Sequence, residues 1–385
     1  MTLDVSPLES EIRRRIAASG PMSVAQYMTL CLTHPEHGYY ITRDPLGAKG
    51  DFVTAPEISQ MFGELIGLWC AAVWNLMGSP DEVRLVELGP GRGTMMRDAL
   101  RAMHIVPAFR KAVTIHLVEI SPALEKRQRQ LLAGTEVPVE WHQSLDQVPE
   151  GPTIIVANEF FDSLPVHQAV MCIDGWHDRV IKIDDDGSLQ FAHGRDPIPL
   201  FEQMLPRPLR GAPIGEIFEW RSDQVALEIG RRVMHCHGAA LIIDYGHVAS
   251  APGDTFQAVG RHSFADPLTA AGTVDLTAHV DFEALAHAAG SLGATVQGPI
   301  EQATFLRRLG IEARAETLKK AARLTANTEV DSALARLISH DKTGMGKMFK
   351  AIAFANPFLG VLPGFEIEQP DHESSDQRVV GGGLG

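Results

Sequence analysis

Three glycines at alternate positions form the most informative cluster in the sequence. They lie in the segment Val86-Glu-Leu-Gly-Pro-Gly-Arg-Gly-Thr94, between a short apolar run and an amphipathic one. Because glycine lacks a Cβ, such a turn between a strand and a helix lets a ligand approach the backbone closely. The dinucleotide pattern Gly-x-Gly-x-x-Gly would need a glycine at position 94, and no Gly-Lys-Ser/Thr phosphate-binding sequence follows. We therefore expect a cofactor without a pyrophosphate, held by Glu87, Gly89, Gly91, Gly93 and Thr94.

An acidic residue ends the next predicted strand, in the segment His116-Leu-Val-Glu-Ile120. An acid at this position can accept hydrogen bonds from both ribose hydroxyls of an adenosine. Taken alone, Glu119 could equally be a solvated charge at a strand end, but the glycine loop before it favours a ligand contact. We expect Glu119 and its neighbour Ile120 to lie against an adenosine group.

A third group of polar residues follows a later predicted strand, in Val156-Ala-Asn-Glu-Phe-Phe-Asp-Ser-Leu-Pro165. Ligands of open α/β sheets bind at the carboxyl ends of the strands, so these side chains should face the reacting group. The two phenylalanines could stack on a planar acceptor while Glu159 or Asp162 binds its positive charge. Alternatively, the rings belong to the core and Asp162 caps a helix. The candidate catalytic residues are Asn158, Glu159 and Asp162.

Short apolar runs alternate with amphipathic segments, which predicts parallel strands joined by right-handed helical crossovers. The carboxyl ends of such strands share one edge of the sheet, which brings the three polar groups together. We therefore expect an α/β, Rossmann-like fold. The predicted strands are Val83–Leu88, Val113–Val118, Val137–Trp141, Thr153–Ala157, Ala240–Ile243 and Ala294–Gln297. The predicted helices are Thr94–Met103, Pro122–Leu132, Gln224–His235 and Phe282–Ala289.

Other segments flank or interrupt this core. Residues 1–80 read as a helical segment with a loop, including helices over Val24–Leu32 and from Ser59 onward. The core is expected to span 81–299 together with 345–360, where Met348–Phe354 is a strand or a helix. Within it, the Asp174-Gly175 and Asp186-Gly187 turns predict an antiparallel hairpin insertion over 167–193. A helical insertion is expected over 300–344, and a flexible tail over 361–385.

The composition narrows the possible partners. The chain has 385 residues, with 34 basic and 48 acidic side chains and a formal net charge of −14. A surface this negative repels a phosphate backbone, so a nucleic-acid substrate is disfavoured. The apolar stretch Ile58–Met77 contains Gln60, Glu64 and Asn75, so we expect a buried helix and no membrane insertion.

The cysteine and histidine pattern gives no metal signal. Four scattered cysteines form no Cys-x-x-Cys pair, so we expect no structural zinc, no redox dithiol and no metal at the site. The sequence His235-Cys-His237 lacks partners at ligand spacing. The scattered cysteines fit a reducing compartment.

The glycine loop and Glu119 together resemble the class I S-adenosylmethionine-dependent methyltransferases. In that superfamily the glycine loop passes under the methionine part of the cofactor, and the acid after the second strand holds the ribose. The resemblance also implies that the loop after the third strand borders the adenine. Here that loop is Gln143-Ser-Leu-Asp146, so Ser144 and Leu145 are expected to contact the cofactor.

A closer resemblance is to the MidA family, the mitochondrial complex I assembly methyltransferases and their bacterial homologues. It implies a protein arginine methyltransferase whose human member modifies a core subunit of respiratory complex I. The N-terminus is not rich in Arg and Ser, so a bacterial, cytoplasmic member acting on NADH:quinone oxidoreductase is expected. The matching stretches are 37–40, 50–60, 62–64, 87–94, 118–122, 158–165, 244–246, 275–282 and 345–350.

Two expectations follow from this resemblance. The segment Gly50–Gln60 is expected to fold over the cofactor as a lid, with Thr54 and Glu57 in contact, although a plain surface loop is the alternative. Glu159 is expected to bind one face of the guanidinium and direct its charge toward the attacking nitrogen. A second carboxylate would help, and either Asp162 or Glu57 could supply it.

Three alternatives remain open. The enzyme could methylate another acceptor, since Asn158-Glu-Phe-Phe161 loosely resembles an Asn-Pro-Pro-Tyr loop without its prolines. The chain could be a non-catalytic, cofactor-binding assembly chaperone. A nicotinamide-dependent dehydrogenase is the third possibility. The oligomeric state is not predicted.

Overall fold

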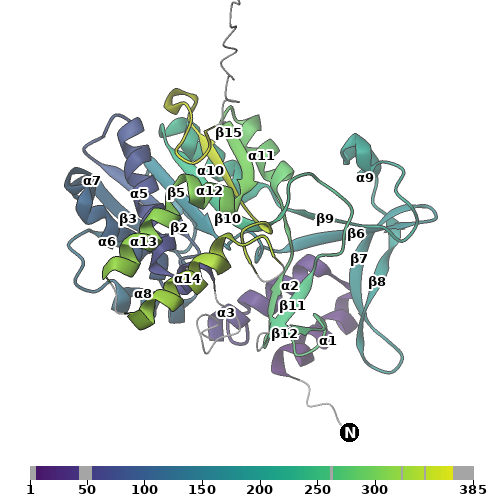
Figure 1. The fold of residues 1–385 in the computed structure, drawn as a ribbon. Coiled ribbons are helices and arrows are strands. Elements are labelled where there is room, and N and C mark those ends of the chain that lie inside the picture. Colours follow the sequence, from purple (N-terminus) through teal and green to yellow (C-terminus); the bar gives the residue numbers. More distant parts are fainter. Residues whose placement is uncertain (1–5, 43–53, 261–262, 322–323, 342–343, 367–385) are drawn as a thin grey trace, which may run out of the picture.

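The computed structural model describes residues 6–42, 54–260, 263–321, 324–341 and 344–366 (Figure 1). Part of the expected lid, residues 50–53, and most of the expected tail, residues 367–385, lie outside the described residues.

The centre of the molecule is an eight-stranded sheet whose path runs β15-β16-β10-β5-β2-β3-β4, with β14 paired to β10 (Figure 1). Strands β4, β3, β2, β5 and β10 are mutually parallel, and β16 runs antiparallel between β10 and β15. The expected α/β, Rossmann-like fold is confirmed, and the segment left open as strand or helix is strand β16. The bounds are β2 Val83–Leu88, β3 Val113–Val118, β4 Val139–His142, β5 Thr153–Asn158, β10 Ala239–His247, β14 Val280–Asp281, β15 Thr295–Glu301 and β16 Phe349–Ala355.

Helices cover both faces of this sheet because successive side chains of a strand point to opposite faces. In β2, Val83 and Leu85 enter one hydrophobic core, whereas Val86 and Leu88 enter the other. The first core contains α5 (Gln60–Leu76), α6 (Thr94–Ala102), α7 (Pro107–Ala112), α12 (Gln302–Arg308), α13 (Ile311–Ala321) and α14 (Leu324–Ile338). The second contains α10 (Gln224–His235) and α11 (Phe282–Ser291).

A second sheet stands apart from the core, at the right of Figure 1. It has the order β1-β7-β6-β9, with β8 paired to β7, so it includes more than the hairpin expected over 167–193. The hairpin was expected to end at residue 193 because the second half of β8, His193–Pro197, is polar and lacks apolar alternation. The bounds are β1 Met22–Ser23, β6 Val166–Cys172, β7 Gly175–Ile183, β8 Leu189–Pro197 and β9 Ile217–Arg221.

The N-terminal helices pack on this second sheet and on a third, small sheet that the sequence did not predict. Its strands are β11 (Gln257–Gly260), β12 (Ser263–Ala265) and β13 (Asp275–Thr277), which are too short to show a clear period. The helices are α1 (Pro7–Ser19), α2 (Val24–Thr33), the single turn α3 (Tyr39–Thr42) and the single turn α4 (Ala55–Ile58).

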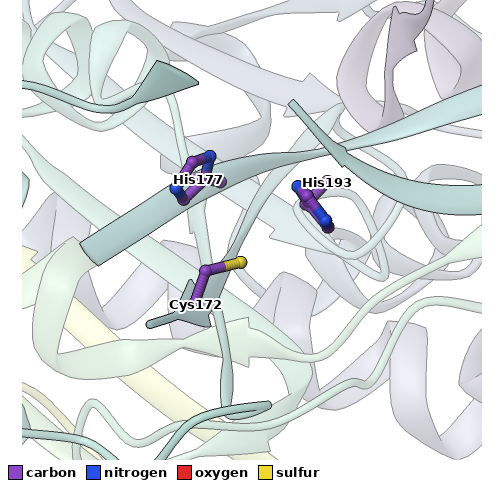
Figure 2. Close-up of side chains that lie close together, drawn as sticks. All are labelled: Cys172, His177 and His193. Carbon is purple, nitrogen blue, oxygen red and sulfur yellow. The ribbon is translucent and has the colours of Figure 1, made fainter. Parts of the chain in front are cut away.

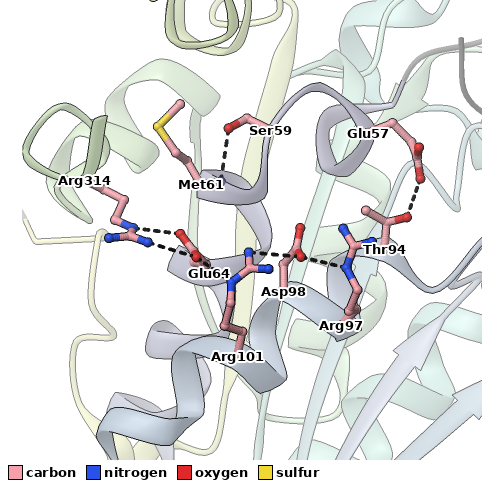
Figure 3. A network of polar contacts seen from close by, with 9 residues as sticks. All are labelled: Glu57, Ser59, Met61, Glu64, Thr94, Arg97, Asp98, Arg101 and Arg314. Atoms are coloured by element: carbon pink, nitrogen blue, oxygen red, sulfur yellow. Dashed lines mark hydrogen bonds and ion pairs between the residues drawn. The ribbon is translucent and has the colours of Figure 1, made fainter. Parts of the chain in front are cut away.

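Helix α5 is the buried helix expected from the apolar stretch 58–77. Its Glu64 is 3% exposed and forms ion pairs with Arg101 of α6 and Arg314 of α13 (Figure 3). Buried carboxylates need such partners because desolvation without them is costly. Glu64 therefore links α13, one of the three helices α12, α13 and α14 that follow β15, to the core. Among the described helices, none combines the length and apolarity needed to cross a membrane.

Candidate active site

A cavity of about 370 Å³ opens at the carboxyl ends of the central parallel strands. It combines residues from β2, β3 and β5 with residues from α3, α4, β10 and β13. Most of the site residues predicted from the sequence line it. They are Thr54, Glu57, Glu87, Gly89, Gly91, Thr94, Glu119, Ile120, Ser144, Leu145, Asn158, Glu159 and Asp162.

The glycine loop has the backbone that three glycines allow. The φ angles of Gly89, Gly91 and Gly93 are +61°, +54° and +84°, a region that side chains with a Cβ rarely adopt. A Cβ on Gly89 would lie 2.8 Å from Cδ2 of Phe160. Gly93 does not line the cavity; it is the N-cap of α6. The loop therefore presents its backbone to the cavity.

Glu119 is tied to the glycine loop through Gln128, a residue of α8 (Pro122–Leu131) that the sequence analysis missed. Oε2 of Glu119 accepts a hydrogen bond from Nε2 of Gln128 at 3.0 Å, and the same nitrogen donates to the Gly91 carbonyl at 2.7 Å. Oε1 accepts from the backbone N–H of Ser121 at 2.8 Å. Burial raises the pKa of Glu119 to about 7. The acid and the loop thus form one rigid unit.

Glu87, at the end of β2, is a buried acid of this cavity. Burial, with the nearby charge of Glu119, raises its pKa to about 8. Its Oε2 is buried and has no hydrogen-bond partner within the described part of the chain. A cationic or hydrogen-bond-donating ligand would relieve this carboxylate.

The loop after β5 holds Glu159 in a left-handed backbone conformation, with φ +49°. Such a conformation costs about 1–3 kcal/mol for a residue with a Cβ and is often found at functional sites. Oε1 of Glu159 accepts from the Ala55 N–H at 2.9 Å and from Nδ2 of Asn158 at 3.1 Å. Burial raises the pKa of Glu159 to about 7, and the charge of Asp162 adds to this.

Asp162 lies beside Glu159, in a buried cluster centred on Asp244. Oδ2 of Asp244 accepts three backbone N–H groups, those of residues 160, 161 and 162, which fixes the loop. Oδ2 of Asp162 accepts from the Tyr245 hydroxyl at 2.7 Å, while its Oδ1 has no partner among the described residues. Burial raises the pKa values of both aspartates. The guanidinium of Arg221 donates to the backbone carbonyls of residues 162, 164, 278 and 279 behind them.

Helices α3 and α4, from the N-terminal part of the chain, line one wall of the cavity. Oε1 of Glu57 accepts from the Thr94 hydroxyl at 2.5 Å (Figure 3). Its Oε2 lies 4.0 Å from the guanidinium of Arg92. The Tyr40 hydroxyl donates to Oδ1 of Asp275 at 2.8 Å. The described part of the expected lid, residues 54–60, therefore contacts both the end of the glycine loop and Glu159.

The remaining predicted residues differ in how far they are buried. Ile120 is 47% exposed, and Leu145 is buried at the start of the short 3-10 turn η2 (Leu145–Gln147), next to Ser144. Of the two phenylalanines, Phe161 belongs to the core and Phe160 lines the cavity. The core reading therefore holds for Phe161, and the stacking of Phe160 on a planar acceptor stays a prediction.

The sequence analysis did not name several cavity residues as site residues. They are Tyr40, Tyr245, Asp275 and Thr277. A signal was present, because each lies in one of the stretches that carry the family resemblance. Their roles could not be assigned because they come from distant segments that only the folded chain brings together.

The cavity is strongly acidic and sheltered. Glu57, Glu87, Glu119, Glu159, Asp162 and Asp275 all line it, and Arg92 also reaches it. Burying this many carboxylates is costly unless a cation compensates them. The arrangement therefore suits a ligand that brings positive charge.

Comparisons with known proteins agree with this geometry. Residues 65–300 match a family described as S-adenosyl-L-methionine-dependent methyltransferase. A mitochondrial protein arginine methyltransferase NDUFAF7 homolog from Drosophila melanogaster is 38% identical, over 92% of this chain and 85% of that protein. The human protein arginine methyltransferase NDUFAF7 is 38% identical over 82% of this chain and 76% of its own length. A crystal structure from Burkholderia thailandensis, bound to S-adenosyl-homocysteine, has a TM-score of 0.80 and 29% identity, covering 93% of this chain and 94% of that one.

Proposed function

Since the chain belongs to the S-adenosylmethionine-dependent methyltransferase family of these relatives, we propose that it methylates an arginine side chain of a protein. The observation that carries the proposal is the group of buried carboxylates after β5, in the same cavity as the glycine loop. A guanidinium is a planar cation with several N–H donors, and paired carboxylates are its natural partners.

The described residues fit the cofactor. The cavity volume of about 370 Å³ lies in the range of small-molecule sites, and the buried Oε2 of Glu87 is orphaned there. We propose that the backbone at Gly89 and Gly91, with Glu87 and Thr94, holds the amino acid part. Glu119 would accept the ribose hydroxyls, and Ile120, Ser144 and Leu145 would border the adenine.

When bound, S-adenosylmethionine supplies a methyl group on a positively charged sulfur. We propose that Glu159 binds the acceptor guanidinium through Oε2, since Oε1 already accepts two hydrogen bonds. Its pKa of about 7 allows Oε2 to take the proton that the attacking nitrogen loses. Asn158 keeps the Glu159 carboxylate in position through its Nδ2.

For the second carboxylate we favour Asp162 over Glu57. Asp162 lies in the same loop as Glu159, and its Oδ1 is buried without a partner in the described chain. Glu57 already accepts from Thr94 and lies near Arg92, on the glycine-loop side. We propose that Glu57 and Thr54 instead help to close the cofactor site.

For the protein substrate, we propose a core subunit of NADH:quinone oxidoreductase, whose assembly the modification would support. The support is the family resemblance, together with an acidic cavity that suits a basic side chain. We also propose a cytoplasmic location, because all four cysteines are free thiols, as in reducing compartments.

The experiment is a methyl-transfer assay. The purified protein and methyl-labelled S-adenosylmethionine are added to extract from cells that lack this protein. We expect the label in a protein fraction and its loss after protease treatment. Label confined to RNA or to small molecules would refute the proposal. The Glu159→Gln variant separates catalysis from a chaperone role, because a chaperone would support assembly equally well without transferring any methyl group.

A further inference from the structure

A second group of reactive side chains lies far from the cavity, on the sheet formed by β6, β7 and β8. Cys172 ends β6, His177 lies in β7 and His193 lies in β8, and the three side chains converge (Figure 2). One possible ligand atom of each side chain lies within 4.8 Å of those of the other two. The spacing Cys-x4-His, with the second histidine 16 residues later, matches no common zinc motif, so the sequence alone did not indicate a metal site here.

The histidine rings are oriented as metal ligands usually are. Nδ1 of His177 lies 2.9 Å from the Gly194 carbonyl oxygen, and Nδ1 of His193 lies 3.0 Å from the same oxygen. Metal-binding histidines commonly donate one ring N–H to a backbone carbonyl, which leaves the other nitrogen free to coordinate. Nε2 of His193 therefore has no partner in the described contacts, whereas Nε2 of His177 pairs with Oδ1 of Asp174 at 2.9 Å, and a metal ion would take the place of that hydrogen bond.

A carboxylate stands next to His177, although it does not belong to the group of ligand atoms that lie within 4.8 Å of one another. Oδ1 of Asp174, in the turn between β6 and β7, lies 2.9 Å from Nε2 of His177. In a tetrahedral zinc site, bonds of about 2.0–2.3 Å place neighbouring ligand atoms roughly 3.3–3.7 Å apart. The Asp174–His177 distance is that of a hydrogen bond and is shorter than this separation, so the Asp174 carboxylate must move back when an ion binds. Rotation of the half-buried Cys172 and the exposed His193 must bring their ligand atoms closer than the present 4.8 Å limit.

The electrostatic environment also favours a cation. The charges of Asp174 and Asp196 both act on the His177 ring, whose side chain is only 3% exposed. These carboxylates attract positive charge, and a divalent ion that binds here replaces the hydrogen bond between His177 and Asp174. The thiol adds the soft ligand that distinguishes zinc from magnesium or calcium.

We propose that Cys172, His177 and His193 bind one Zn²⁺, with the Asp174 carboxylate in the fourth position. Cys172 coordinates as the thiolate and releases its proton to solvent, and both imidazoles bind as neutral rings. The ion joins three strands at the end of the second sheet where β6 turns into β7. Its role is structural, since all four positions are filled by the protein.

A second cluster of metal-ligand types, His116, Glu140 and His142, is a weaker candidate. Nδ1 of His116 and Nε2 of His142 already share a hydrogen bond at 3.0 Å. The positive charges of Arg84 and Arg232 act on His116, which disfavours a cation there. It also offers no thiolate.

The test is zinc binding by the full-length protein, stripped with a chelator and titrated with ZnCl₂ against a chromogenic zinc indicator. We expect one bound zinc per chain, and at least a tenfold weaker affinity in both Cys172→Ser and His193→Ala. His193 is exposed, so its replacement should leave the fold intact, which far-ultraviolet circular dichroism checks. Cobalt substitution should give a thiolate-to-metal charge-transfer band that Cys172→Ser abolishes.

Two further variants serve as controls. His235→Ala alters an exposed histidine of the His-Cys-His sequence and should bind zinc like the wild type. His142→Ala removes the competing cluster and should do the same. The proposal is overturned if the stripped wild type takes up no zinc, if Cys172→Ser and His193→Ala bind it unchanged, or if binding disappears with His142→Ala.

Discussion

Glu159 is the residue on which the proposed chemistry depends most. Its backbone is held at φ +49° by the hydrogen bonds that Asp244 accepts from the next three residues. Its carboxylate also accepts the N–H of Ala55, the first residue of α4. A strained backbone fixed from two sides positions a charge accurately, as transfer to a bound nitrogen requires.

The first prediction concerns this carboxylate. Glu159→Gln keeps an oxygen for the Ala55 N–H but removes the charge that would bind a guanidinium. We expect kcat for methyl transfer to fall about 100-fold or more, while the affinity for S-adenosyl-homocysteine stays unchanged. Steady-state assays and calorimetry measure the two quantities. Equal activity of the variant and the wild type would remove Glu159 from the mechanism.

The second prediction concerns the ribose contact. Glu119→Gln removes a charged acceptor while keeping a similar shape, so S-adenosyl-homocysteine should bind roughly 10- to 100-fold more weakly. Glu125→Gln is the matched control, because Glu125 lies on α8, the helix that follows Glu119, and pairs only with Arg129 in the described contacts. If both variants bind with wild-type affinity in calorimetry, the ribose role of Glu119 is wrong.

The third prediction is a pH dependence. Burial raises the pKa of Glu87 to about 8 and that of Glu119 to about 7. A carboxyl whose pKa is higher in the folded protein binds more protons there than in the unfolded chain, so its stabilisation is lost as the pH rises through that range. The cofactor-free protein should lose on the order of 1 kcal/mol or more of unfolding free energy between about pH 5 and pH 8. Denaturant titrations should show a shallower loss for Glu87→Gln, and an unchanged slope would contradict the assignment.

At the scale of elements, the central strands were predictable and the flanking sheets were not. Strands β2 and β3 match the expected Val83–Leu88 and Val113–Val118 because each is a short, mostly apolar run that is buried on both faces. The third sheet consists of strands of three or four residues, which carry no usable period. Strand β1 has two residues and exists only because β7 pairs with it.

The fourth prediction concerns the ion pair that links α13 to α5. Arg314 of α13 binds the buried Glu64 through two nitrogens, at 2.7 and 3.0 Å. Arg314→Ala should lower the free energy of unfolding by about 1–3 kcal/mol, because the buried carboxylate keeps only Arg101. Arg307→Ala is the control: its partner Glu312 is exposed, so we expect a change within about 0.5 kcal/mol. Chemical denaturation that gives equal losses for both variants would contradict this account.

For the whole molecule, the sequence predicted the cavity residues at the strand ends of the central sheet better than those from other elements. The glycine loop, Glu119 and the loop after β5 all end strands of one sheet, so topology alone brings them together. Tyr40, Tyr245 and Asp275 come from α3, β10 and β13, and only tertiary packing places them in the cavity. The zinc ligands were missed for the same reason, since pairing of β6, β7 and β8 creates the cluster.

The measurement that tests the central claim most directly is tandem mass spectrometry of NADH:quinone oxidoreductase core subunits, from cells with the wild-type protein, with Glu159→Gln, and without the protein. We predict a methylated arginine in one core subunit that is present only with the wild-type protein. If every arginine of these subunits carries the same modification in all three strains, the proposed substrate is wrong. If, in addition, the purified enzyme transfers its methyl group to another kind of acceptor and not to arginine, arginine methylation itself is contradicted.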